Sequence, residues 1–390
     1  MTPAPRALVT DGEHRAVLAA CRGLHRAGYA VTVSSAKRVA MAAWSRATER
    51  RITLPDARTS PELFVEALAG SVASRSWDVL VPGTEASLLP VSAARDELEP
   101  HVAVGLPPHP IVLRSLDKHV LQLAATEVGL APPTSIACKD RSEAVAAATE
   151  IGFPLVVKPA RSFQAVSDAP DAALEQRGPV LVEKEGDLDA ALRSVRAPMT
   201  VQRFVQDPRI VSCAGVRLPE GVAGFTVARY VRTWSPGVGS AAFARTSEPP
   251  EGLRSRIEEL LARIGWEGIF ELELFDEGDG RFEAIDLNPR PFGWLSLAIG
   301  AGANLPAIWC DHVLGRSTAP AADAAPGYGY RWEEGELKYV VRHVRRLDKR
   351  AFAPLRPQRK VIHACFELRD PAPFLAQSLG LAGSLFGRKD

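Results

Sequence analysis

Residues 269–288 bring several oxygen-bearing side chains close together in the chain. Their pattern predicts two strands joined by a tight turn, and alternate residues of a strand share a face. Glu271 and Glu273 then share a face of the first strand, and Asp286 and Asn288 share a face of the second. Carboxylate and amide oxygens gathered in this way suit Mg²⁺, which keeps substrate phosphates among its other ligands. The hairpin therefore predicts a metal site.

The plain alternative is an ordinary exposed hairpin with polar outer faces. Four apolar residues argue against it, because they can fill the opposite, buried face: Leu272, Leu274, Ile285 and Leu287. The acidic side chains are then crowded on one face, and like charges that close destabilise a hairpin unless a cation neutralises them. Arg290 follows the second strand directly and offers a forked cation for a phosphate or a carboxylate.

A second candidate for anion binding is the stretch 229–240. Arg229 and Arg232 stand three residues apart, shortly before Gly237 and Gly239. Glycines let a backbone approach an anion closely. The alternative is a plain β-turn with surface cations, and Arg245 is a weaker companion in either case.

Four motifs, taken in order, resemble those of the ATP-grasp superfamily. They are the Leu116-Asp117-Lys118 segment at a helix start, the Gly152–Pro159 strand that carries Lys158, the Val201–Val205 hinge strand, and the Asp286-Leu287-Asn288-Pro289-Arg290 signature. The resemblance covers roughly residues 5–315. Within the superfamily, residues 266–293 look most like the carboxylate–amine ligases of the D-aspartate-ligase-like and carbamoyl-phosphate-synthase-like group.

The resemblance implies a role for each matching residue. Phosphates of ATP would be held by Lys118 and Lys158, with Arg229 touching phosphate or substrate. Adenine would lie against the hinge, which is formed by Gln202, Arg203, Phe204 and Val205. The ribose would be bound by Gln202, or by Glu183 or Asp207 in its place. Mg²⁺, or Mn²⁺ instead, would be held by Glu273, Asp286 and Asn288. Arg290 and Arg232 would be the catalytic cations.

The implied reaction joins a small-molecule carboxylate to an amine. ATP would phosphorylate the carboxylate to an acyl phosphate, which the amine then attacks, with ADP and phosphate released. One rival is a bicarbonate-activating carboxylase or carbamoyl-phosphate-type enzyme, disfavoured because the chain has neither a biotinylation segment nor a duplicated half. Another is an ATP-binding protein with degenerate catalysis. A homodimer is suggested by the resemblance alone.

Three features depart from the superfamily pattern. The flap over the phosphates is often rich in glycine, whereas residues 160–176 contain none and include Asp168, Asp171 and Glu175. This raises the question of whether the flap closes over ATP. The hinge has Gln202 where an acidic residue is common, and Asp286 is one methylene shorter than the usual glutamate.

Strands alternate with helices over the first hundred residues, which predicts a parallel sheet covered on both faces. The turn at 10–15 has a single glycine, which disfavours a dinucleotide site. Thr84 and Glu85 follow the 78–81 strand, where α/β sheets place ligands, and are weaker candidates for a substrate pocket. The fold class expected is α/β and α+β: a Rossmann-like domain at 1–108, a two-lobed ATP-grasp unit at 109–200 and 201–317, and an extension at 318–390.

Composition excludes several classes of protein. The 390 residues hold 47 Lys and Arg against 46 Asp and Glu, too balanced for a dedicated nucleic-acid binder. No window is apolar enough to span a membrane, and the N-terminus lacks the pattern of a secretory signal. The five cysteines are scattered and odd in number, against a disulfide framework. The sequence therefore predicts a cytoplasmic protein.

Overall fold

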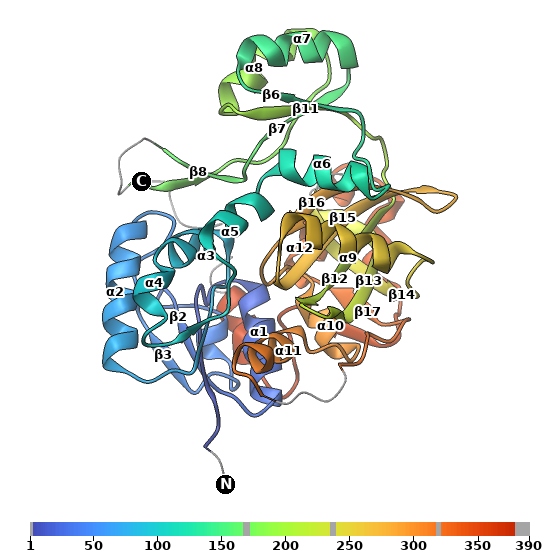
Figure 1. Cartoon of the computed structure of the whole chain (residues 1–390). Helices are drawn as coiled ribbons and strands as arrows, with labels where there is room; N and C mark the ends of the chain where they lie inside the picture. Colours follow the sequence, from blue (N-terminus) through green and yellow to red (C-terminus); the bar gives the residue numbers. More distant parts are fainter. Residues whose placement is uncertain (1–2, 167–171, 235–238, 317–320, 379–390) are drawn as a thin grey trace.

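The computed structural model describes residues 3–166, 172–234, 239–316 and 321–378 (Figure 1). Three main sheets, each packed with helices, make up most of the structure, and a two-stranded ribbon is a fourth sheet. Within these residues, no helix combines the length and the apolar character that a membrane crossing requires.

The N-terminal unit is a five-stranded parallel sheet of order β3-β2-β1-β4-β5, as the alternating pattern predicted. Its strands are β1 (Arg6–Val9), β2 (Ala30–Ser34), β3 (Arg50–Ile52), β4 (Val79–Val81) and β5 (Ala103–Val104). Its helices are α1 (Arg15–Arg26), η1 (Ala42–Trp44, a 3₁₀ helix), α2 (Pro61–Ser74), α3 (Glu85–Ala93) and α4 (Arg95–Leu98). The central strands are apolar throughout because helices bury both faces, so Leu8 and Leu80 are fully buried.

The second unit is a four-stranded antiparallel sheet of order β10-β7-β11-β6 with a small core of its own. Its elements are β6 (Ser135–Cys138), α7 (Arg141–Ile151), β7 (Leu155–Pro159), β10 (Val180–Val182), α8 (Glu185–Ser194) and β11 (Met199–Arg203). A separate two-stranded ribbon, β8 (Phe163–Ala165) and β9 (Leu174–Gln176), lies in the region of the expected flap. Residues 167–171, with Asp168 and Asp171, lie outside the described part of the chain.

Two helices, α5 (His109–Ser115) and α6 (Lys118–Glu127), join the first unit to the second. Pro110 stands at the second position of α5, where its missing N–H costs no hydrogen bond.

The third unit is a seven-stranded sheet of order β16-β15-β12-β13-β14-β17-β18. Its strands are β12 (Ile210–Leu218), β13 (Gly221–Trp234), β14 (Ser240–Ser247), β15 (Gly268–Gly278), β16 (Arg281–Asn288), β17 (Gly329–Arg331) and β18 (Val361–His363). Its helices are α9 (Leu253–Ile264), α10 (Leu295–Gly300) and α11 (Leu305–Val313). The residues predicted as a C-terminal extension thus contribute two strands, β17 and β18, to this sheet.

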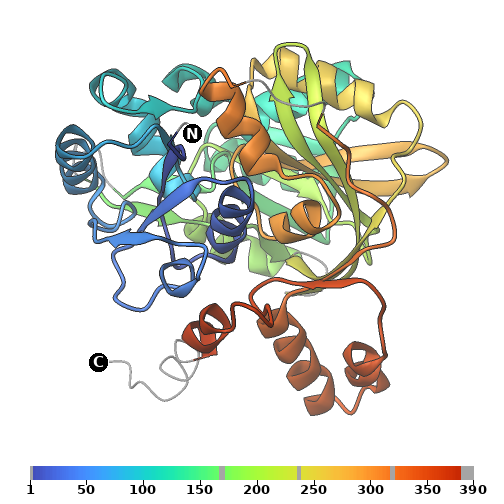
Figure 2. The same cartoon turned by 90° about the horizontal axis from the view of Figure 1, so that it is seen from below.

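The remaining C-terminal elements are α12 (Glu333–Arg345) and η2 (Lys349–Leu355), which project from the body (Figure 2). Beyond β18 the chain returns to α1. There the buried Arg22 donates from Nε to Asp370 Oδ2 at 3.0 Å and from a terminal nitrogen to the Cys365 carbonyl at 3.1 Å. Asp370 also accepts from Ser45 Oγ at 2.5 Å and from the Arg46 N–H at 3.0 Å. The end of the described chain is therefore tied to the first unit by a buried ion pair.

Candidate active site

The β15–β16 hairpin places its acidic side chains as the alternation predicted. Glu273 lies opposite Asp286 in the antiparallel register, and Glu271 lies opposite Asn288. One expected core residue does not lie in the core. The register shifts next to Glu273, so that Leu274 pairs with Ala284 and Ile285 turns toward the cleft instead. A β-bulge of this kind turns a side chain to the other face of the strand, and a prediction based on simple alternation of faces cannot detect it.

Glu271 is a buried carboxylate that gathers hydrogen-bond donors. It accepts from Ser212 Oγ at 2.9 Å, Tyr230 OH at 3.1 Å, Asn288 Nδ2 at 3.2 Å and the indole N–H of Trp294. Three of these donors converge on Glu271 Oε1 and Asn288 donates to Oε2, so the carboxylate holds Asn288 and Tyr230 in position. The Asn288 side-chain oxygen in turn accepts from Arg290 at 2.9 Å. The sequence did not indicate Tyr230 or Trp294 as site residues. Tyr230 lies on a different strand and Trp294 in a loop, and neither stands at a recognisable spacing from the acidic residues.

Glu273 and Asp286 are the carboxylates that face the cleft. Burial, together with the neighbouring Glu271 and Asp286, raises the pKa of Glu273 to about 8. Within the described residues, no group of three or more His, Cys, Asp or Glu is arranged to hold a metal by itself. The Glu273–Asp286 pair still fits Mg²⁺, because a cation there would relieve the repulsion and Mg²⁺ needs only one or two protein carboxylates beside phosphate and water.

Two lysines face this pair from the second unit and its connecting helix. Lys118 begins α6, which Asp117 caps through the His119 N–H at 2.9 Å. Its Nζ lies 2.9 Å from Asp286 Oδ1 and 3.3 Å from Ser162 Oγ. Burial opposes the charge of Lys118, but Asp286, Glu85 and Glu273 outweigh it and raise its pKa. Burial and the nearby Lys118 lower the pKa of Lys158, on β7, to about 8.

The hinge residues line the same cleft as the lysines. Gln202, Arg203, Phe204 and Val205 border a cavity of about 180 Å³ together with Lys118, Lys158, Glu273 and Asp286. Phe275 and Ile285 add apolar wall on the opposite side. Gln202 is 4% exposed and donates from its side chain to Ser135 Oγ at 2.9 Å. The cleft thus offers an apolar slot at one end and four charged groups at the other.

Three of the predicted binding residues lie elsewhere. Arg232 forms a buried bidentate pair with Glu336 of α12, with both contacts at 2.7 Å. Register shifts on either side of Arg232 turn it away from the face that Tyr230 occupies. Arg229 pairs with Asp276 at 2.7 Å, and Asp207 borders a separate cavity beside Tyr339. The anion-binding role predicted for the two arginines is therefore not supported by their geometry, and Gly237 lies outside the described residues.

A second cavity, of about 620 Å³, adjoins the cleft and shares Ser162, Gly239, Glu273 and Asp286 with it. Arg290 borders it and donates to the Pro291 carbonyl and to Asn288 Oδ1, both at 2.9 Å, while its Nε is buried without a partner. Glu85, at the start of α3, borders it too. Glu85 is 6% exposed, and its Oε1 is buried and also has no partner.

Two further residues of the first unit border this cavity, His14 and Arg15. Burial lowers the pKa of His14, so its imidazole is neutral at pH 7. The cavity therefore combines an unpaired cation, an unpaired carboxylate and a neutral imidazole. The sequence pointed to Arg290 and, from its strand-end position, to Glu85, but no pattern in the sequence placed His14 beside them.

No family model matches the chain. Among curated proteins it is 31% identical over 241 residues to the formate-dependent phosphoribosylglycinamide formyltransferase of Bifidobacterium longum, covering 55% of this chain and 56% of that protein. It is 26% identical over 187 residues to the carbamoyl phosphate synthase large chain of Vibrio parahaemolyticus, covering 45% of this chain and 16% of the relative. The chain thus spans about half the length of the first relative and much less of the second.

Solved structures match over more of the chain. The N5-carboxyaminoimidazole synthetase of Staphylococcus aureus, complexed with ADP, has a TM-score of 0.64 at 13% identity and covers 84% of this chain and 82% of its own. The L-amino acid ligase of Bacillus licheniformis also scores 0.64, at 15% identity, over 84% and 79%. The solved structures show the fold that the ATP-grasp resemblance implied, and the sequence relatives agree with that resemblance.

Proposed function

We propose that this protein is an ATP- and Mg²⁺-dependent ligase that activates a carboxylate as an acyl phosphate and joins it to an amine. The observation that carries the proposal is the Glu273–Asp286 pair, which faces Lys118 and Lys158 across one cleft with Arg290 beside it. The names of the relatives support it, since a formyltransferase that depends on formate and an amino acid ligase both unite a carboxylate with an amine.

The chain's residues would act mainly by positioning and by neutralising charge. Lys118 and Lys158 would hold the nucleotide phosphates, and the hinge would hold adenine. Mg²⁺, or Mn²⁺ with the same oxygen donors, would be held by Glu273 and Asp286 and would draw negative charge from the phosphates. A carboxylate oxygen then bonds to the γ-phosphorus as the bond to ADP breaks. The amine attacks the acyl carbon, phosphate leaves, and Arg290 balances the charge on the departing group.

The larger cavity is proposed to hold the two substrates. Arg290, with its free Nε, suits the carboxylate, and Glu85, with its free Oε1, suits the amine in its ammonium form. His14, which is neutral at pH 7, is a base near the point where the ammonium must lose a proton before it attacks.

Glu85→Gln tests this division. The variant is expected to raise KM for the amine about tenfold, the cost of losing a charge-assisted hydrogen bond, and to leave KM for MgATP within twofold. Steady-state kinetics with each substrate varied in turn measures both. Glu127→Gln, at an exposed site on α6, serves as control. An unchanged KM for the amine would contradict the proposal that Glu85 binds the amine.

Nucleotide binding without metal should depend on pH through Lys158. Its pKa is lowered to about 8, so it loses its charge as the pH rises through that value. We expect ADP affinity, measured by calorimetry in EDTA, to fall about fivefold to tenfold between pH 7 and pH 9.5. Lys158→Arg should make the fall smaller because a guanidinium stays charged, and the fall that remains comes from Glu273, whose pKa is also about 8. Lys184→Arg, at an exposed position, should leave the profile unchanged. A flat profile in the unaltered protein would contradict this role for Lys158.

The reaction itself is tested by a screen for ADP release. Pairs of amines with amino acids, formate, bicarbonate and other carboxylates are incubated with MgATP, and products are identified by mass spectrometry. ADP formed only when both substrates are present, with an amide as product, supports the ligase. A carbamate formed from bicarbonate would favour the carboxylase-type alternative. Nucleotide binding with no ADP released across the screen would favour a degenerate ATP-binding protein.

The setting of the protein is also part of this proposal. All five cysteines are buried and free, which supports a reducing, cytoplasmic compartment. A homodimer is proposed on the resemblance alone, and sedimentation velocity measures it directly.

A further inference from the structure

A third cavity, of about 860 Å³, lies outside both cavities of the candidate active site. Its walls come from α2, α3, α4 and α5 on one side and from the ribbon β8–β9 on the other. The ribbon is held against the first unit by a hydrogen bond from the Leu174 N–H to the Arg58 carbonyl at 2.6 Å. A space of this size, open to solvent between two units, can hold a small organic molecule.

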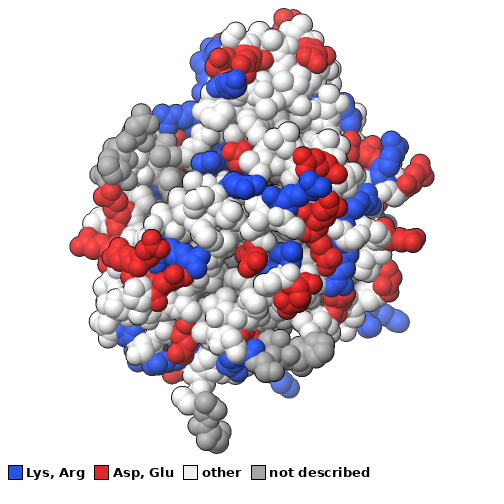
Figure 3. All heavy atoms as spheres, viewed as in Figure 1, with Lys and Arg blue, Asp and Glu red and all other residues white. Residues whose placement is uncertain are grey.

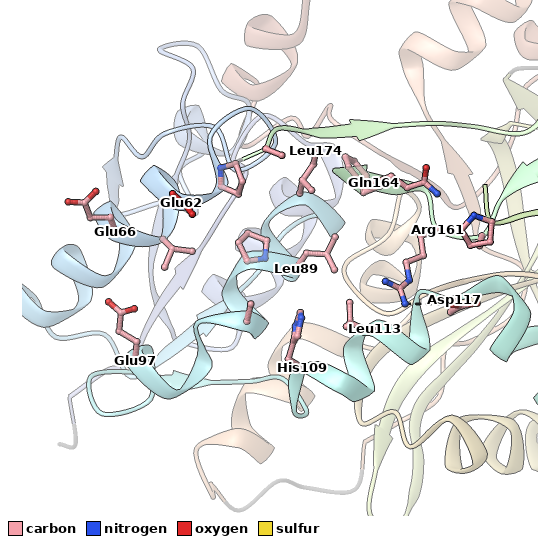
Figure 4. Close-up of a pocket in the computed structure, with 18 residues that line it drawn as sticks. Glu62, Glu66, Leu89, Glu97, His109, Leu113, Asp117, Arg161, Gln164 and Leu174 are labelled. Carbon is pink, nitrogen blue, oxygen red and sulfur yellow. Dashed lines mark ion pairs between the residues drawn. The ribbon is translucent and has the colours of Figure 1, made fainter. Parts of the chain in front are cut away.

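The charges around this cavity are unevenly distributed. Figure 4 shows Glu66 and Glu97 at one end and the Arg161–Asp117 pair at the other, with Leu89 and other apolar side chains between them. Glu62 is the third glutamate in the lining. Within the part of the chain that the structure describes, these three glutamates form no ion pair or hydrogen bond through their side chains. Figure 3 shows acidic side chains gathered on the same side of the molecule, where α2 and α4 lie in Figure 1.

We propose that this cavity binds an organic cation with an apolar body, its ammonium or guanidinium group toward the glutamates. Charge complementarity selects a cation over an anion, because Arg161, the one Lys or Arg among the described lining residues, is already paired with Asp117 at 3.6 Å. His109 adds no positive charge at neutral pH, since burial and Arg161 lower its pKa. The apolar walls select a hydrophobic body over a metal ion or a polyamine.

Only two short segments of chain separate this cavity from the nucleotide cleft. Asp117 and Arg161 border the cavity, while their chain neighbours Lys118 and Ser162 border the cleft. The two segments are joined by a hydrogen bond from the Lys118 N–H to the Ala160 carbonyl at 3.0 Å. A ligand that displaces Arg161 from Asp117 would therefore disturb the cap of α6 and the position of Lys118. We infer that its binding changes nucleotide affinity, and only this second part rests on the proposed nucleotide site.

Binding is tested with 4-phenylbutylamine, 4-phenylbutan-1-ol and 4-phenylbutanoate as matched cationic, neutral and anionic probes in ligand-observed NMR titrations. We expect saturable binding of the amine, weaker binding of the alcohol and least of the acid. Leu89→Trp should place an indole between the two ends of the cavity, where the apolar body of the ligand would lie, and weaken amine binding at least tenfold, whereas Leu63→Trp, on the exposed face of α2, should not. Equal binding of amine and acid, no saturable binding of the amine, or binding that survives Leu89→Trp would each overturn the proposal.

The charge selectivity has a control of its own. Glu97→Gln is expected to weaken amine binding about threefold and leave the alcohol unchanged, as for one partly exposed ion pair. Asp96→Asn, at the neighbouring position of α4 outside the cavity, should change neither. An equal loss for amine and alcohol in Glu97→Gln would contradict a cation site.

Coupling to the cleft is tested by reciprocity. Saturating 4-phenylbutylamine should change the dissociation constant of ADP by at least about threefold, and saturating ADP should change that of the amine by the same factor. Ordinary amine binding with an unchanged ADP constant would overturn the coupling while leaving the cavity as a binding site. Loss of ADP binding in the protein without amine would instead count against the proposed function.

Discussion

Asp286→Asn should lower the rate of ADP formation by about 10²–10³-fold while the protein stays folded. The substitution keeps the shape of the side chain but removes a charge that serves two groups. Asp286 faces Glu273 across the hairpin and lies 2.9 Å from Lys118 Nζ. Without it, the proposed metal loses one of its two carboxylates and Lys118 loses the anion that holds it. Single-turnover measurement of ADP, with circular dichroism for folding, tests this.

The control for Asp286→Asn is Asp279→Asn in the turn of the same hairpin. Asp279 is exposed and has a φ of 52°, a conformation that Asn adopts readily, so its turnover should be unchanged. Asn288→Ala should also lose turnover, because Asn288 connects Glu271 to Arg290. Full turnover in Asp286→Asn would contradict the proposal that Asp286 holds the metal.

Asp370→Asn should destabilise the folded protein by about 2–3 kcal/mol, because the buried Arg22 loses a charged hydrogen-bond partner and keeps only the more exposed Glu367, at 3.3 Å, as an ionic partner. Arg22 and Asp370 are each 9% exposed and connect α1 to the end of the described chain. The three hydrogen bonds that Arg22 donates to the Asp370 side chain and to the Asp370 and Cys365 carbonyls would weaken, and the new amide would place N–H groups toward the guanidinium. The free energy of unfolding in urea, followed by tryptophan fluorescence, measures the loss.

Two variants separate this pair from ordinary surface charge. Arg26→Gln removes an exposed partner of Glu367 at the same contact and should cost no more than about 1 kcal/mol. Adding Arg22→Met to Asp370→Asn should recover part of the lost stability, since no buried charge then remains unpaired. A loss below 1 kcal/mol in Asp370→Asn would show that the contact does not hold the chain end.

The Arg22–Asp370 pair also predicts that its contribution to the stability of the folded protein decreases in acid. Burial raises the pKa of Asp370, but hydrogen bonds from Ser45 and Arg46 and the charge of Arg22 outweigh it, so the net pKa lies below its ordinary 3.8. The contribution of a carboxylate with a lowered pKa is complete above its unfolded value and disappears as the pH falls through its folded value. The stability difference between the unaltered protein and Asp370→Asn should therefore shrink below about pH 4.

The hairpin was predictable because its information is local. Strand alternation depends on neighbouring residues alone, so Glu271, Glu273, Asp286 and Asn288 were expected on one side and are found there. Even here a single bulge changed the place of Ile285. The parallel sheet of the first unit was predictable for the same reason, since its strands and helices alternate with a clear period.

The positions of the two arginines of β13 could not be predicted from the neighbouring sequence. Strict alternation would put Arg232 on the face of Tyr230, but register shifts against β14 turn it to Glu336, more than a hundred residues later. Which partner an arginine takes depends on the element that packs over it, and no pattern in residues 229–240 encodes α12.

Residue types and their spacing thus predicted the acidic hairpin and the parallel sheet of the first unit, because each depends on short stretches of chain. The two lysines near the hairpin were expected only from the resemblance to the ATP-grasp motifs. The packing of three sheets decided the rest. This packing placed Glu85 and His14 in the same cavity as Arg290, and it surrounded Glu271 with hydrogen-bond donors instead of leaving it free for a metal. It also paired Arg232 with Glu336, outside the candidate site, and Arg22 with Asp370. These outcomes depend on burial and distance between residues far apart in the chain, and both quantities exist only once the chain has folded.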